Sequence, residues 1–127
     1  MGNVEMTEEK CTEETRLTRE ACAYLLANLG RRVTIAELAE RLSVSQTRLK
    51  TSFRACCGMS IHSYVRQEKM ALAARLLRES DESVLTIAGQ VGYENGSKFA
   101  QVFRQVMGVT PMGYRRGQRR AEREERA

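Results

Sequence analysis

Hydrophobic residues recur along this chain at intervals of three and four, the spacing of one face of an α-helix. No segment shows sustained alternation of hydrophobic and polar residues, as a half-buried strand would. The first helical face is formed by Leu17, Ala21, Tyr24, Leu25 and Leu29. Gly30 follows it and is expected to end the helix. The pattern predicts an all-α fold.

Capping residues and glycines mark six further helices. Thr34 and Glu37 form a capping box, in which the Thr34 hydroxyl accepts from the Glu37 amide and Glu37 reaches back. The expected N-caps of the next four helices are Ser45, Ser60, Ser83 and Asn95. Thr110-Pro111 starts the last helix, because proline at the first helical position gives up only an unused donor. The expected helix stops after Gly30 are Gly58, Gly92 and Gly108.

The chain contains an internal duplication of a short helix, a turn and a longer helix, which is a helix-turn-helix unit. At an offset of 49, Ile35, Leu38, Ala39, Leu42 and Val44 correspond to Val84, Ile87, Ala88, Val91 and Tyr93. At an offset of 50, Leu49, Phe53, Arg54, Gly58 and Tyr64 correspond to Phe99, Phe103, Arg104, Gly108 and Tyr114. An α-solenoid is disfavoured, because that architecture needs three or more similar units.

In each unit, the buried face of the second helix determines which residues are exposed. The residues expected to be buried are Leu49, Phe53 and Cys56, and Phe99, Phe103 and Val106. Those then exposed are Gln46, Thr47, Lys50, Thr51 and Arg54, and Gly96, Ser97, Lys98, Gln101 and Arg104. Neither exposed face has an acidic residue, although a solvated helix face normally mixes both signs. This favours contact with DNA, whose major groove admits an α-helix.

A long helix is predicted between the two units, from Ser60 to Arg78. Its length is roughly 28 Å at 1.5 Å per residue. Successive major grooves on one face of B-DNA are about 34 Å apart. The helix therefore suits two reading helices in successive major grooves, with DNA bending that costs on the order of a few kcal/mol covering the difference.

The charge distribution also indicates an anionic partner. The 127 residues have a formal net charge of +5 and a pI near 9.3. Residues 31–120 hold sixteen basic and seven acidic residues, a net +9, whereas residues 1–30 are net −3 and residues 121–127 net −1. Residues 1–14, which include Glu8, Glu9, Glu13 and Glu14, are interpreted as an acidic leader or linker. Residues 117–127 are interpreted as a charged C-terminal tail.

Residues for metal or catalytic chemistry are not arranged as such sites require. Cys11, Cys22, Cys56 and Cys57 lack CxxC spacing and are interpreted as reduced thiols. His62 is the only histidine, and no nucleophile or carboxylate pattern accompanies it. We therefore expect no enzyme, no cofactor and no metal. The longest apolar run has seven residues, too short for a membrane span, and a cytoplasmic location is expected.

The two units also contain residues that match a known family signature. In the second unit these are Ile87-Ala88, Val91-Gly92-Tyr93, Ser97-Lys98-Phe99, Phe103-Arg104, Gly108, Thr110-Pro111 and Tyr114-Arg115. The first unit agrees at Leu38-Ala39, Ser45, Leu49, Phe53-Arg54 and Gly58. These residues resemble the signature of the DNA-binding domain of the AraC/XylS family of bacterial transcription regulators. The resemblance covers roughly residues 16–116. It implies seven helices, with helix-turn-helix subdomains at residues 15–58 and 83–116 joined by a linker helix at 60–79, in a domain of residues 15–116.

The resemblance implies sequence-specific binding of double-stranded DNA for transcription regulation. By resemblance, base contacts are expected from Gln46, Thr47, Lys50 and Thr51, and from Gly96, Ser97, Lys98 and Gln101. Phosphate contacts are expected from Arg41, Arg54 and Arg104. Ser43 replaces the glycine that the family commonly has in the first turn, which predicts backbone strain there. Lys69 stands where the family usually has Arg.

Three readings of the whole protein remain open. The acidic leader favours the DNA-binding part of a larger effector-responsive regulator, in which a domain absent here would sense the small molecule. The alternatives are a free-standing short regulator and, with less support, a helical protein-interaction module. Two reading helices in one chain suit a monomer on an asymmetric site. Activation would also require a surface for RNA polymerase, and no motif marks one.

Overall fold

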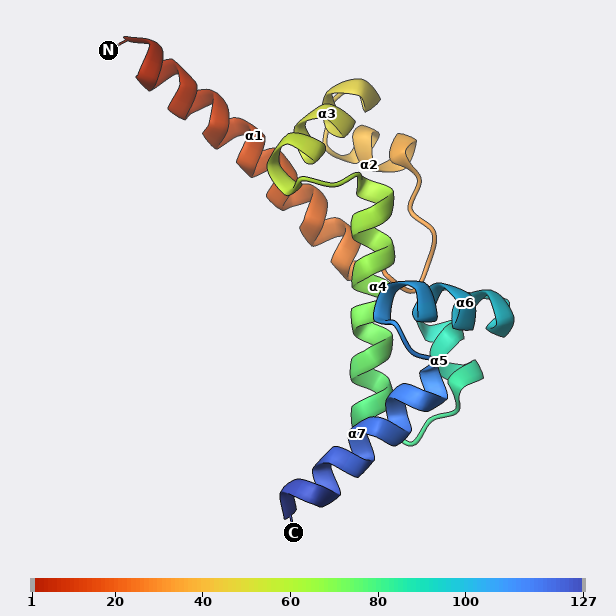
Figure 1. Ribbon diagram of the computed structural model, residues 1–127. Helices are drawn as coiled ribbons and strands as arrows, with labels where there is room; N and C mark the ends of the chain where they lie inside the picture. Colours follow the sequence, from red (N-terminus) through yellow and green to blue (C-terminus); the bar gives the residue numbers. More distant parts are fainter. Residues whose placement is uncertain (1, 127) are drawn as a thin grey trace. The chain divides into compact units, whose positions relative to one another are not determined.

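The computed structural model describes the backbone of residues 2–126 and the side chains of residues 13–126. These residues form seven α-helices and no strand (Figure 1). The helices are α1 (Gly2–Ala27), α2 (Ile35–Arg41), α3 (Gln46–Cys57), α4 (Ile61–Glu79), α5 (Val84–Gln90), α6 (Gly96–Met107) and α7 (Pro111–Arg126). The predicted all-α, seven-helix fold is confirmed. The predictions for the side chains of Glu8, Glu9 and Cys11 lie outside the described residues.

The expected N-caps are present at the starts of the helices. The Oγ1 of Thr34 accepts from the Glu37 amide at 3.1 Å. The hydroxyls of Ser45, Ser60 and Ser83 each accept, at 3.1 Å, from the amide three residues further on. The Oδ1 of Asn95 accepts from two amides of the first turn of α6, at 2.8 and 3.2 Å. Each cap satisfies donors that the helix itself leaves unpaired, and so fixes where the helix begins.

The chain divides into two compact units, and α4 contributes residues to both. The first unit comprises Met1–Asn28 and Arg32–Val65, and the second Leu29–Arg31 and Arg66–Ala127. The core of the first unit is Ala21, Leu25, Leu38, Ala39, Leu49, Phe53 and Ile61. The core of the second is Met70, Ala73, Ala74, Leu77, Ile87, Ala88, Val91, Phe99, Val102 and Phe103. Each unit therefore has a hydrophobic core of its own.

One burial prediction is wrong, in the same way in both units. Cys56 and Val106 are exposed, whereas Ser52 and Val102, one turn earlier, are buried. The periodicity identified the correct helix face, because Leu49, Phe53, Phe99 and Phe103 are fully buried. It could not show how far along the helix the core extends. In the last turn of α3 it is Cys57, the neighbour of Cys56, that packs against the core of the first unit.

The turns between helices depend on left-handed backbone. Gly58 and Gly108 end α3 and α6 with φ of 73° and 83°. Gly92 has φ 84°, and Ser43 at the equivalent place in the first unit has φ 57°. Ser43 is the only described non-glycine residue with a positive φ, so the predicted strain in the first turn is confirmed. A side chain in this conformation costs about 1 kcal/mol or more.

Helix α1 begins within the segment interpreted as a leader, and Glu14 contacts α3. The Ser52 hydroxyl donates to Oε2 of Glu14, and Nη2 of Arg48 lies 3.6 Å from its other carboxylate oxygen. The boundary at residue 14 remains a prediction. The contact nevertheless means that the acidic segment reaches the first unit at its last residue.

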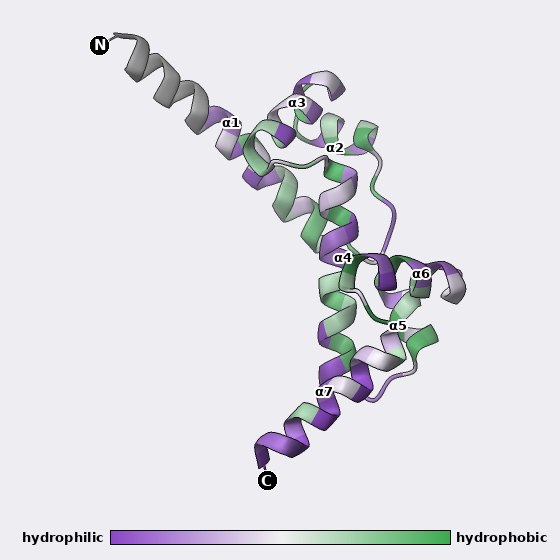
Figure 2. Cartoon of the chain, viewed as in Figure 1, coloured by the Kyte–Doolittle hydropathy of each residue, from purple (hydrophilic) through white to green (hydrophobic). Residues whose placement is uncertain are grey.

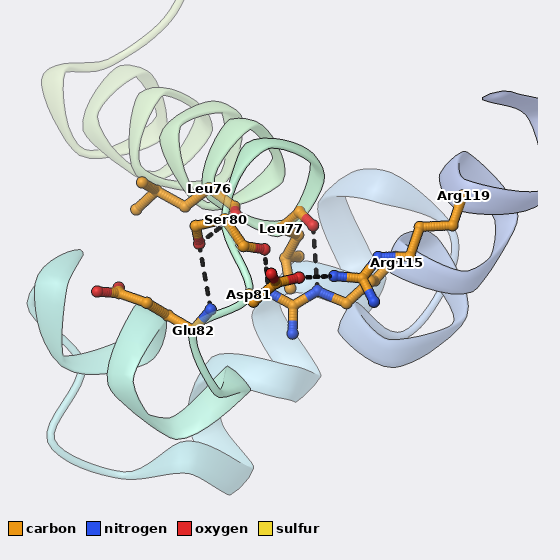
Figure 3. A network of polar contacts seen from close by, with 7 residues as sticks. All are labelled: Leu76, Leu77, Ser80, Asp81, Glu82, Arg115 and Arg119. Carbon is orange, nitrogen blue, oxygen red and sulfur yellow. Dashed lines mark hydrogen bonds and ion pairs between the residues drawn. The ribbon is translucent and has the colours of Figure 1, made fainter.

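Helix α7 is attached to the end of α4 by Arg115, which is buried (Figure 3). Its Nε donates to the carbonyl of Leu77 at 3.1 Å, and its Nη2 to that of Ser80 at 3.2 Å. The guanidinium thereby satisfies two carbonyls at a helix end, where intrahelical partners run out. Hydrophilic residues predominate in the rest of α7 (Figure 2), which remains helical to Arg126.

Candidate DNA interface

The residues predicted to read bases in the first unit lie along the exposed side of α3. Gln46, Thr47, Lys50 and Thr51 are all exposed, as is Arg54. Leu49 and Phe53 hold the opposite side of the helix in the core. The Ser45 hydroxyl accepts from the Arg48 amide in the first turn and so fixes where the helix begins. The side chains of Gln46 and Thr47, in this capped turn, are exposed. The helix contains three basic residues and no acidic one.

A hollow of about 340 Å³ lies beside this row of residues. It is lined by Ile35 of α2, by Lys50, Thr51 and Arg54 of α3, and by Ser60, Ile61 and His62 at the start of α4. Three of the predicted site residues, Lys50, Thr51 and Arg54, therefore line one hollow. It also adds Ser60 and His62, which the sequence reading did not assign to an interface.

The second unit presents a similar row along α6. Ser97, Lys98, Gln101 and Arg104 are exposed, and Gly96 is half-buried. A Cβ at Gly96 would lie 3.2 Å from Cδ1 of Leu85, which is itself 68% exposed. A larger residue at this position would therefore displace Leu85. That Gly96 contacts DNA through its backbone remains a prediction.

The three arginines predicted to contact phosphate are all exposed, but their settings differ. Arg54 lines the hollow beside α3, and Arg104 occupies the equivalent place in α6. Arg41, in the last turn of α2, lies over the ring of Tyr24 with 5.2 Å between the guanidinium carbon and the ring centroid. This cation–π contact orients the Arg41 side chain without neutralising its charge.

Helix α4 supplies two cations to the second unit, one to Tyr93 in the turn before α6 and one to Gln105 of α6 itself. Lys69 Nζ lies 5.7 Å from the ring centroid of Tyr93, and Nη2 of Arg66 donates to Gln105 at 2.5 Å. Burial lowers the pKa of Lys69. Burial also raises the pKa of Tyr93, while the positive charge of Arg66 opposes that rise. Neither Lys69 nor Arg66 belongs to the exposed row of α6, since both are residues of α4.

His62 was considered in the sequence only as a catalytic residue, so its place in the lining of the hollow was not expected. The repeat gave no signal for it, since position 62 corresponds to Met112 at an offset of 50. Both follow an N-cap by two residues, so both lie on the first turn of a helix that starts beside a reading helix. The sequence also gave no signal for the contact of Ser52 with Glu14, which joins α3 to α1.

Comparison with known proteins identifies the family. The sequence model of a helix-turn-helix domain family matches residues 38–117, which include α3 to α6 and parts of α2 and α7. A Streptomyces lividans protein whose name describes it as AraC-like is 36% identical over 83 residues, 65% of this chain and 27% of that protein. The chain belongs to the AraC/XylS family. The resemblance noted in the sequence is thereby confirmed.

Two further relatives extend the comparison of this AraC/XylS-type domain. The HTH-type transcriptional activator RhaR of Yersinia pseudotuberculosis is 35% identical over 91 residues, 72% of this chain and 31% of the activator. The DNA-binding domain of AdpA, a global transcriptional factor solved in complex with a target DNA, superposes with a TM-score of 0.77 at 28% identity. That match covers 82% of this chain and 94% of the AdpA domain. The chain spans about a third or less of the two curated relatives.

No group of three His, Cys, Asp or Glu side chains in the described part of the chain is placed to hold a metal ion. None of its helices is both long enough and apolar enough to cross a membrane.

Proposed function

We propose that this AraC/XylS-type domain binds double-stranded DNA with sequence preference and thereby regulates transcription. The observation that carries the proposal is the repeated pair of capped helices, α3 and α6, on each of which the predicted contact residues form one side that contains basic side chains and no acidic residue. An α-helix with such a side can enter a major groove and meet base edges there.

The residues divide into two roles in this proposal. Base readers are Gln46, Thr47, Lys50 and Thr51 on α3, and Ser97, Lys98 and Gln101 on α6, with Gly96 allowing close approach of the backbone. Phosphate contacts are Arg41, Arg54 and Arg104. Charged contacts to the DNA backbone supply affinity and register, whereas contacts to base edges supply sequence preference. The exposure of the side chains on both rows supports their availability for contact with DNA.

The proposal extends to the working form of the protein. The domain acts as a monomer on a site with two blocks, because each of its units has its own reading helix. It works in the cytoplasm and performs no catalysis. RNA polymerase is its further partner in activation, and a small-molecule effector acts only through a region outside this chain. The small share of the curated relatives that the chain spans supports this view of a part of a larger regulator.

The test is a selection of random duplexes by the purified chain, followed by affinity measurements over a range of salt concentrations. We expect an enriched site with two blocks about one helical turn apart. For about six phosphate contacts, the log–log slope of affinity against salt is expected near −5. A flat slope with no enriched site would favour the helical protein-interaction module instead.

A further inference from the structure

The hollow between α2, α3 and α4 concentrates groups that bind anions. Lys50 and Arg54 line it from α3, and His62 lines it from α4. Two hydroxyls, of Thr51 and Ser60, complete its polar lining. Each of the seven lining residues lies in the described part of the chain, and none is acidic. Such a site attracts a negatively charged oxygen group, and no negatively charged side chain in its lining opposes the binding of that group.

Two isoleucines strengthen this electrostatic attraction. Ile61 is buried at 5% exposure, and Ile35 is half-buried, so part of the lining of the hollow is apolar. Apolar walls exclude water and lower the local dielectric constant, and charges attract more strongly in such surroundings. A phosphate that enters the hollow would therefore gain more from Arg54 than it would on an open surface.

We propose that this hollow seats a phosphate of the DNA backbone and that His62 is one of its ligands. The proposal rests on the DNA binding proposed above and adds a residue that no sequence pattern assigned. The hollow adjoins the row of base readers on α3, because Lys50 and Thr51 belong to both. The phosphate seated there belongs to the strand that borders the groove read by α3.

The internal repeat makes this site specific to the first unit. At an offset of 50, Lys50 corresponds to Ala100 and His62 to Met112, and only Arg54 keeps its charge, as Arg104. The second unit thus retains one of the three nitrogen-bearing side chains. It follows that the first unit contributes more of the salt-dependent affinity than the second.

The single histidine allows direct detection of the contact by NMR. His62 is the only histidine in the chain, so its imidazole gives one unambiguous set of signals. We expect these signals to shift on titration with a duplex of about 20 base pairs and to saturate when the chain is fully bound. Inorganic phosphate at matched phosphate concentration should shift them much less. Saturation by inorganic phosphate, with the duplex leaving the signals unmoved, would overturn the proposal.

Affinity measurements with substituted chains provide the second test. His62→Met introduces the residue that the equivalent place in the second unit already carries, so the fold should accept it. We expect it to weaken duplex binding by about threefold to tenfold, equally for all sequences, as for one net hydrogen bond. Arg54→Gln should make the salt slope shallower by about 0.9, or about eightfold in affinity at 0.1 M salt. Met112→Ala is the matched control and should leave the affinity unchanged.

The two proposals fail differently in this experiment. If His62→Met binds every duplex as tightly as the natural chain, the phosphate seat is wrong while DNA binding stands. If the natural chain does not bind duplex DNA in a salt-dependent manner, the proposed function fails and the phosphate seat fails with it. Unfolding curves of each variant show whether a loss of affinity reflects a loss of fold.

Discussion

Ser43 and Gly92 occupy equivalent places in the two helix-turn-helix units, and both have left-handed backbone, with φ of 57° and 84°. Glycine adopts this conformation without the clash that a Cβ causes. We expect Ser43→Gly to raise the free energy of unfolding by about 1 kcal/mol, since the exposed Ser43 side chain contributes little to packing. Denaturant unfolding measures the change.

The reverse substitution in the second unit provides the control. A Cβ at Gly92 would lie 3.1 Å from Nζ of Lys69 and 3.3 Å from the carbonyl of Leu29. Gly92→Ser should therefore destabilise the domain by roughly 2 kcal/mol, from backbone strain and this crowding together. A destabilised Ser43→Gly variant would show that the Ser43 side chain has an unrecognised role.

Buried and exposed side chains of α3 and α6 should differ in how much stability is lost when each is replaced by alanine. Phe53→Ala and Phe103→Ala should each lower the free energy of unfolding by about 3–5 kcal/mol, because each leaves a cavity in a fully buried place. Cys56→Ala and Val106→Ala should each cost within about 0.5 kcal/mol, because both side chains are exposed. Thermal melting of the four variants decides this. A similar loss of stability in all four variants would indicate that Cys56 and Val106 are buried, as periodicity alone suggested.

Substitution of the buried Arg115 is expected to lower the stability of the domain strongly. Arg115→Met removes two hydrogen bonds and leaves the carbonyls of Leu77 and Ser80 without this partner, at a cost of about 2–4 kcal/mol. Arg115→Lys should recover little, because one ammonium group cannot reproduce the two-pronged guanidinium contact. The melting temperature is the readout, and the exposed neighbour in Arg116→Met serves as the control. A melting temperature of Arg115→Met equal to that of the control would refute the structural role.

The division of α6 into base and phosphate contacts is tested by a panel of single base changes. Gln101→Ala should lose about 1–3 kcal/mol of discrimination at one base pair, if the amide makes a bidentate contact. Arg104→Ala should instead weaken binding to every duplex by a similar factor, because phosphates carry no sequence information. The comparison uses the site obtained by selection. An unaltered preference profile for Gln101→Ala would remove that residue from the base readers.

The cysteine pair at the end of α3 predicts a difference in alkylation. Burial, with the neighbouring Cys22 as a further cause, raises the pKa of the Cys57 thiol above its ordinary value of 9.0. The thiolate is the reacting form, so Cys57 should react with iodoacetamide more slowly at pH 8 than the exposed Cys56. Tandem mass spectrometry distinguishes the two residues. In urea the two rates should converge, and equal rates in the folded chain would argue against the burial of Cys57.

The raised pKa also has a consequence for stability. A proton is held more tightly on Cys57 in the folded state than in the unfolded state, so the folded state is favoured while the thiol stays protonated. This contribution is fully present below the unfolded-state pKa. It is lost as the pH rises through the higher folded-state pKa, and the domain should therefore lose stability in strongly alkaline solution.

The sequence by itself determined the helices, their starts and their repetition. Caps such as Thr34 and Asn95 act on amides two or three residues away, and the three-four spacing that buries Phe53 and Phe103 is a property of one helix. The repeat at offsets of 49 and 50 then identified two units, and the exposed rows on α3 and α6 followed from the buried ones. All of these are local relations, which a linear pattern can express.

Only the tertiary structure decided where the packing stops and which distant residues meet. Periodicity gives the direction of a side chain but not the extent of the neighbouring helices, so the exposure of Cys56 and Val106 could not be foreseen. The contact of Arg115 with Leu77, and the hollow that His62 and Arg54 both line, depend on how separate helices pack within a unit. Packing of this kind results from the combined shape of many side chains, and no single stretch of sequence contains it.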